Sequence, residues 1–131
     1  MKALLFPGQG VQKIGMLDEI ISSNSEIHDF LAKASEGLDF DLIKLITSGP
    51  EEKLNLTEYA QPAILASSIA IIRAKKLNSN ITVTAGLSLG EYSALVYANC
   101  LKFSDALKLV NVRGRLMQNA VPEGTAGMLV I

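Results

Sequence analysis

Residues 86–90 read Gly-Leu-Ser-Leu-Gly, a Gly-x-Ser-x-Gly pentapeptide. The preceding run, Ile-Thr-Val-Thr-Ala at 81–85, is rich in β-branched residues and predicts a strand, and residues 91–96 predict a helix. A serine between two glycines at a sharp strand-to-helix turn is typical of a nucleophile elbow, because a side chain at either flank would collide with neighbouring backbone. An ordinary Gly/Ser turn is the alternative, but the flanking elements favour the elbow. We therefore expect Ser88 to be a nucleophile.

Apolar runs elsewhere predict strands that alternate with helices. The run Ala3-Leu4-Leu5-Phe6 predicts a buried strand that ends at Pro7, and residues 128–131 predict a further strand. Helices are expected near 16–21, over 25–35, over 42–47 between Asp41 and Gly49, from about 57 or 62 to 76, and from Ser104 as N-cap to about 120. This alternation predicts an α/β fold, with helices on both faces of a parallel sheet.

Composition restricts the class of protein. With 131 residues, 49% of them hydrophobic, the chain has the size and apolar content of one globular domain. Its net charge is −1, and the one basic cluster, at 73–76, is interpreted as a cationic last helical turn, so no nucleic-acid partner is expected. The apolar start is too short for a signal peptide or a membrane span. Cys100, the single cysteine, excludes an internal disulfide and is expected to be a small core residue; we expect a cytoplasmic protein.

The expected strands are few for the number of helices, since a parallel sheet needs neighbours along its edges and cover on both faces. A serine elbow also needs a general base, usually histidine, and the sequence has one histidine, His28. His28 falls beside the apolar stripe of its helix and is expected to be a plain surface residue. We therefore expect the chain to be part of a larger protein and to lack turnover by itself.

Arg113 has an unusual position on its predicted helix. It falls on the same side as Ala106, Leu109, Val110, Met117 and Ala120, whereas Lys108, Asn111, Arg115 and Asn119 share a side that we expect to be solvated. A guanidinium on an apolar face needs an anionic partner. Two interpretations stay open: a structural salt bridge or snorkelling to solvent, and a ligand carboxylate held by two hydrogen bonds. Separately, the glycines of Pro7-Gly8-Gln9-Gly10 would let backbone approach a ligand after the first strand, although an ordinary turn is equally compatible.

Four segments, at 6–12, 56–63, 86–92 and 112–118, resemble in order and spacing the motifs of the malonyl-CoA:acyl carrier protein transacylase family. The resemblance covers the whole chain. It implies an α/β-hydrolase-like large subdomain, of which residues 1–125 would be the N-terminal part, and an inserted ferredoxin-like small subdomain that begins at 126–131. The catalytic histidine and the remaining strands would lie in the absent part of a longer protein.

By the same resemblance, Ser88 is the malonylated serine, the backbone N–H groups of Gln9 and Leu89 form the oxyanion hole, Arg113 binds the malonyl carboxylate, and Gln61 lines the pocket. Most members have histidine where this chain has Leu87, but that residue is not the base. The implied reaction moves malonyl from malonyl-CoA to the phosphopantetheine thiol of acyl carrier protein, in fatty acid or polyketide synthesis, with no metal and no bound cofactor. An α/β-hydrolase-type esterase and a non-catalytic fragment or pseudo-enzyme are the alternatives.

Overall fold

A computed structural model describes residues 1–77, 80–121 and 124–125. The elements in these ranges, in chain order, are β1 (Lys2–Phe6), α1 (Asp18–Ser23), α2 (Ser25–Ser35), α3 (Leu42–Ser48), α4 (Glu51–Asn55), α5 (Thr57–Ala74), β2 (Ile81–Gly86), α6 (Gly90–Tyr97) and α7 (Phe103–Gln118). The strand predicted at 128–131 lies outside the described residues.

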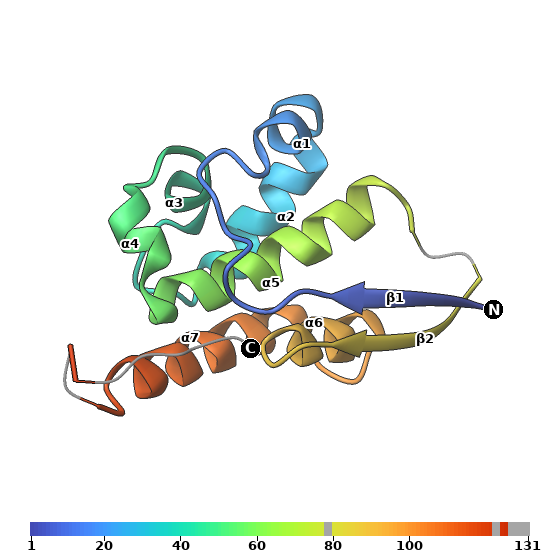
Figure 1. The fold of residues 1–131 in the computed structure, drawn as a ribbon. Helices are drawn as coiled ribbons and strands as arrows, with labels where there is room; N and C mark the ends of the chain where they lie inside the picture. The colour runs from blue at the N-terminus through green and yellow to red at the C-terminus, as the bar shows by residue number, and fades with distance from the viewer. Residues whose placement is uncertain (78–79, 122–123, 126–131) are drawn as a thin grey trace.

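The two strands pair in parallel, with Leu4 opposite Thr84 and Phe6 opposite Gly86. Figure 1 shows them side by side, with α1 to α4 gathered above α5 and α7 below it, and α6 packs against both strands. Since α1 to α5 connect β1 to β2, the chain makes a helical crossover between parallel strands, as such pairs require. The predicted α/β fold, with a small parallel sheet and flanking helices, is confirmed.

Helix α5 forms the centre of the core. Its residues from Ala60 to Ser67 are all buried, which agrees with a predicted helix that is apolar on nearly every side. Helices α2, α3, α4, α6 and α7 contact it. The buried core also includes Leu17, Leu31, Leu42, Ile46, Leu54, Leu89, Leu107 and Val110.

The β1 run is less buried than its apolar sequence predicts. Phe6 is buried, but Leu5 is 73% exposed and Ala3 is also exposed. On β2, Val83 is exposed as well. Apolar character predicts a preference for burial, whereas burial itself depends on which elements lie opposite; the described residues leave part of this small sheet open.

Two local expectations are wrong, and one helix was missed. Helix α7 starts at Phe103, with Lys102 at the N-cap, so Ser104 lies inside the first turn and is not the cap; the Phe103 ring stacks on Phe30 at 4.7 Å. Cys100 is exposed rather than in the core, since it follows the left-handed Asn99 in the turn after α6. Helix α4 was not predicted from the sequence. The predicted stop of α3 is confirmed, because Gly49 has φ +77° and its N–H donates to the Leu45 carbonyl at 3.1 Å.

Candidate active site

Ser88 stands at a sharp turn between β2 and α6, as the pentapeptide predicts. Its φ of +50° is in the left-handed region, which a non-glycine residue rarely adopts. The Leu87 N–H donates to the Phe6 carbonyl at 3.1 Å, and the Gly90 N–H donates to the Leu87 carbonyl at 2.8 Å. These bonds fasten the turn to the end of β1 and hold the exposed Ser88 side chain at the start of α6.

The two glycines of the turn are needed for their size. A Cβ on Gly86 would collide with the Gly90 backbone, and a Cβ on Gly90 would collide with the Phe6 carbonyl and lie 2.8 Å from the Pro7 oxygen. Positive φ occurs at Ser88 and not at either glycine. The collision predicted for flanking side chains is therefore confirmed, and the strained residue is the serine itself.

The Arg113 guanidinium donates hydrogen bonds to two of the predicted site residues. One terminal nitrogen (Nη2) donates to Ser88 Oγ at 2.9 Å, and the other (Nη1) donates to Gln61 Oε1 at 2.7 Å. Gln61 is completely buried, and its Nε2 lies 3.3 Å from Met117 Sδ. The Tyr92 ring lies 5.6 Å from the guanidinium carbon. Three residues from α5, the elbow and α7 thus meet at one point.

Arg113 keeps an unneutralised charge there. Among the described residues, no carboxylate lies within ion-pair distance of it, and its two partners are neutral. The structural salt bridge that sequence reasoning left open is therefore not found in this part of the chain. A half-buried cation in contact with the candidate nucleophile can bind an anion on the substrate.

The face of α7 that carries Arg113 differs from the expected one. Leu109 is 47% exposed and Met117 is 38% exposed, whereas Asn111, expected in solvent, is only 6% exposed. The buried face consists of Ala106, Leu107, Val110, Asn111 and Gly114. The helical period was right, but the position of the packing partner, α5, decides which side is covered.

Gln9 and Leu89 lie on the two loops that meet at the elbow. The Gln9 side-chain amide (Nε2) donates to Thr57 Oγ1 at 3.3 Å, and this bond connects the Gln9 loop to the start of α5. A Cβ on the neighbouring Gly8 would lie 3.1 Å from the Leu87 carbonyl, so the two loops touch. Within the described ranges, neither the Gln9 nor the Leu89 N–H donates to another protein group, and both remain free for a ligand oxygen.

His28, the single histidine of the sequence, is exposed on α2, as predicted. Its Nδ1 lies 3.3 Å from Asp29 Oδ1. In the part of the chain that the structure describes, Ser88 Oγ contacts the Arg113 guanidinium and no imidazole. His28 is therefore not a base for Ser88.

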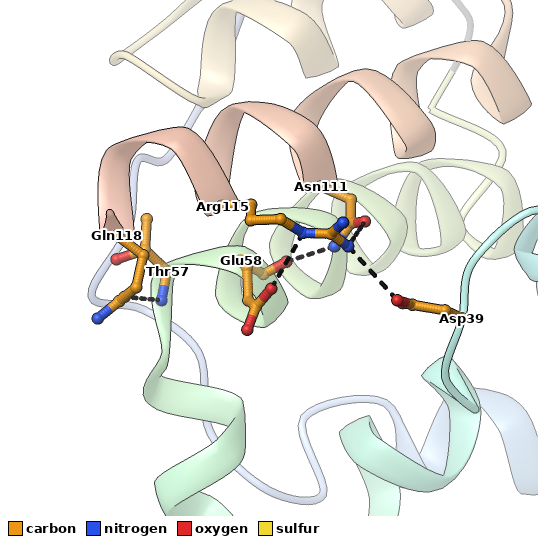
Figure 2. Close-up of polar contacts among 6 residues, drawn as sticks. All are labelled: Asp39, Thr57, Glu58, Asn111, Arg115 and Gln118. Carbon is orange, nitrogen blue, oxygen red and sulfur yellow. Dashed lines mark hydrogen bonds and ion pairs between the residues drawn. The ribbon is translucent and has the colours of Figure 1, made fainter. Parts of the chain in front are cut away.

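Sequence reasoning missed a set of polar contacts between α5 and α7 (Figure 2). Asn111 Nδ2 donates to the Glu58 carbonyl at 2.9 Å, and the Thr57 N–H donates to Gln118 Oε1 at 3.0 Å. Arg115, expected to stay in water, lies 3.4 Å from both Glu58 Oε2 and Asp39 Oδ2. The proline at position 62 could have indicated these contacts, because a proline inside a helix leaves the carbonyl one turn earlier without its helical donor.

Tyr59 is the described group whose pKa clearly departs from its ordinary value. Partial burial raises the pKa of the Tyr59 phenol, and the negative charges of Glu58 and Asp39 raise it further. Its ring packs edge-on against Phe40 at 4.9 Å, outside the Ser88 site.

In the described part of the chain, every helix falls short of what a membrane crossing requires, and His, Cys, Asp and Glu side chains do not gather in threes as metal ligands would.

Comparison with known proteins gives one family. Residues 3–130 match the acyl transferase domain family. The malonyl CoA-acyl carrier protein transacylase of Haemophilus influenzae is 49% identical over 132 residues, a match that covers 98% of this chain and 42% of that protein. The protein of the same name from Staphylococcus aureus strain MSSA476 is 44% identical with the same coverage.

Solved structures agree. An acyl carrier protein S-malonyltransferase from Vibrio cholerae superposes with a TM-score of 0.87 at 50% identity, over 94% of this chain and 41% of that one. A malonyl-transacylase in complex with its type II PKS acyl-carrier protein gives a TM-score of 0.87 at 48% identity, over 94% of this chain and 40% of that one. The chain thus spans about two fifths of the length of the relatives it matches.

Proposed function

The chain belongs to the acyl transferase domain family, and from that premise we propose that it carries the nucleophile and the carboxylate-binding residues of a malonyl-CoA:acyl carrier protein transacylase. The observation that carries the proposal is Arg113, a cation without a carboxylate partner among the described residues, whose guanidinium donates to Ser88 Oγ at 2.9 Å. A single methylene separates the malonyl carboxylate from the carbonyl that reacts. A cation in contact with the nucleophile is therefore close enough to bind the malonyl carboxylate while Ser88 attacks the carbonyl.

In the proposed first half-reaction, Ser88 Oγ attacks the thioester carbonyl of malonyl-CoA while its proton passes to a base. The Leu89 and Gln9 N–H groups, free of protein acceptors in the described ranges, donate to the oxyanion. The C–S bond then breaks, and coenzyme A leaves as the thiol with the proton. Malonyl remains on Ser88 as an ester.

In the second half-reaction, the phosphopantetheine thiol of acyl carrier protein attacks that ester. The C–O bond breaks, malonyl passes to the thiol, and Ser88 recovers its proton. The base is proposed to be a histidine from outside residues 1–131, since His28 is exposed on α2. The reaction as proposed needs no metal or bound cofactor, because an activated serine and the thioester suffice.

Gln61 is proposed to position Arg113 while substrate binds. Its Oε1 accepts from one guanidinium nitrogen at 2.7 Å, and its burial leaves it few other orientations. The other nitrogen, now on Ser88, is the one that would turn toward the malonyl carboxylate.

The whole-protein assignment extends beyond the described fold. We propose that residues 1–125 form the N-terminal part of an α/β-hydrolase-like large subdomain and that a ferredoxin-like small subdomain begins at 126–131. Cytoplasmic fatty acid or polyketide synthesis is the proposed setting. The names of the relatives support the synthetic role, and the single cysteine, which fits a reducing compartment, supports the cytoplasmic location.

The test compares malonyl-CoA with acetyl-CoA in the full-length protein that contains this segment. Loss of a charged partner at a half-buried site costs on the order of 2 kcal/mol, so Arg113→Ala should lower kcat/KM for malonyl-CoA by about 30-fold. Acetyl transfer should change much less, because acetyl has no carboxylate. Lys108→Ala, an exposed cation on the same helix, is the control.

Equal losses for the two substrates would assign Arg113 a structural role. Arg115→Ala does not serve as the control, because Arg115 contacts Glu58 and Asp39. An esterase would hydrolyse simple acyl esters through Ser88 and would show no preference for malonyl that depends on Arg113.

A further inference from the structure

The first turns of α5 lack two of their usual hydrogen-bond partners. Leu56, at the N-cap, has no side-chain acceptor for the free N–H groups that follow it. Pro62, inside the helix, has no N–H to donate to the Glu58 carbonyl one turn earlier. A donor and an acceptor near the start of α5 therefore need partners from another element.

Helix α7 supplies both partners from one face. Gln118 Oε1 accepts from the Thr57 N–H at 3.0 Å, and Asn111 Nδ2 donates to the Glu58 carbonyl at 2.9 Å (Figure 2). Between them, Gly114 allows the backbones to approach, since a Cβ there would lie 2.5 Å from the Thr57 oxygen. Positions 111, 114 and 118 follow the i, i+3, i+7 spacing of a single helical face.

These contacts fix α7 against the turn of α5 that ends at Gln61. Arg113 lies between the two anchoring positions, and Gln61 Oε1 accepts from it at 2.7 Å. Asn111 is the buried anchor, only 6% exposed, and it donates to the Glu58 carbonyl, which lies one turn before Pro62 and receives no N–H from that proline. A shift of α7 along or around its axis would move the guanidinium away from Ser88 and Gln61 together.

We propose that Asn111 is a positioning residue for malonyl recognition. Its side-chain amide binds the carbonyl that Pro62 leaves free and thereby holds Arg113 at the nucleophile. The inference rests on the proposed function, because it requires Arg113 to bind the malonyl carboxylate. It adds a residue that touches no substrate and acts through helix placement.

The test is a double-mutant cycle between Asn111 and Pro62 in the full-length protein. Asn111→Leu keeps the branched shape of the side chain and removes both the donor to the Glu58 carbonyl and the Oδ1 that accepts from Arg115 Nη2 at 3.4 Å. We expect malonyl kcat/KM to fall about tenfold, whereas acetyl kcat/KM should stay within about twofold. Pro62→Ala restores an N–H that can satisfy the Glu58 carbonyl within α5. In that background, Asn111→Leu should lower malonyl kcat/KM by less than about threefold.

Two further variants complete the design. Asn111→Ala, measured beside the leucine variant, should show the same loss of malonyl over acetyl preference, so that a single poorly folded variant does not decide the outcome. Asn119→Ala changes the same residue type at an exposed position at the end of α7 and should keep the wild-type preference. Thermal melting reports stability separately from preference.

The possible outcomes separate the two proposals. If Arg113→Ala lowers malonyl preference but the Asn111 variants only lower the melting temperature, Asn111 is purely structural and the inference is wrong. An equal loss with and without Pro62 would also overturn it, because the free carbonyl would not be the link. If Arg113→Ala leaves the preference unchanged, the proposed function fails, and this inference fails with it.

Discussion

Within the elbow, Ser88 adopts the strained backbone conformation, and the two flanking glycines leave the space that the turn needs. Ser88 has φ +50°, while Gly86 and Gly90 let three backbone segments meet where a Cβ would overlap them. The serine is thus held at the start of α6, where free N–H groups favour a developing negative charge. The pentapeptide predicted this geometry because its two glycines lack the side chains that would collide with neighbouring backbone.

Gly90→Ala tests that packing. The new Cβ would meet the Phe6 carbonyl and the Pro7 oxygen, so the turn must move, and the free energy of unfolding should fall by about 1–3 kcal/mol. Chemical denaturation of the full-length protein measures it. Gly37→Ala is the matched control, because its Cβ would meet only the flexible end of Lys108. Equal stability of the Gly90 variant and the control would show that the turn relaxes freely.

Individual polar residues were predicted unevenly. The resemblance named Ser88, Gln61 and Arg113, and the structure brings these three together. Arg115 is exposed as predicted, although its contacts with Glu58 and Asp39 were missed. The placement of Asn111 in solvent was wrong, since a helical projection ranks sides by hydrophobicity and does not show where the backbone of the next helix lies. Asn111 is buried where its side-chain amide donates to the Glu58 carbonyl of α5, and this contact depends on how the two helices pack.

At the scale of elements, the contact of α5 with α7 brings together Gln61 and Arg113, the residues proposed to bind substrate. Helix type and most boundaries could be predicted, because 18 residues of α5 are apolar on nearly every side and Asp41 and Gly49 bound α3. Helix α4 was missed, since five residues carry too little periodicity. Pro62 made the start of α5 ambiguous, yet the helix continues through it, and α7 provides the bond that the proline removes from the ladder.

Gly114→Ala probes this contact directly. A Cβ would lie 2.5 Å from the Thr57 oxygen and 2.6 Å from the Glu58 Cα, which are backbone atoms that yield only if the helices separate. We expect unfolding free energy to fall by about 1–3 kcal/mol and malonyl preference to fall with it. Ser104→Ala, exposed on the same helix, should change neither. A destabilised Gly114 variant with full malonyl preference would separate helix packing from the placement of Arg113.

At the scale of the whole molecule, the described residues form a helical core with a sheet of two strands. Sequence hydrophobicity overestimated the burial of that sheet, because Leu5 and Val83 are apolar but remain 73% and 48% exposed in the described structure. The chain spans about two fifths of its relatives, and the histidine that Ser88 requires is proposed to lie in the remainder. We therefore propose that this segment supplies the nucleophile, the oxyanion donors and the carboxylate-binding arginine.

The most direct measurement of that assignment is the site of acylation. The full-length protein containing residues 1–131 is incubated with malonyl-CoA, quenched in acid, digested and analysed by mass spectrometry. We expect one malonyl group on the peptide that carries Ser88, and none on the same peptide from Ser88→Ala. Malonyl on another residue, or a label that persists in Ser88→Ala, would contradict it.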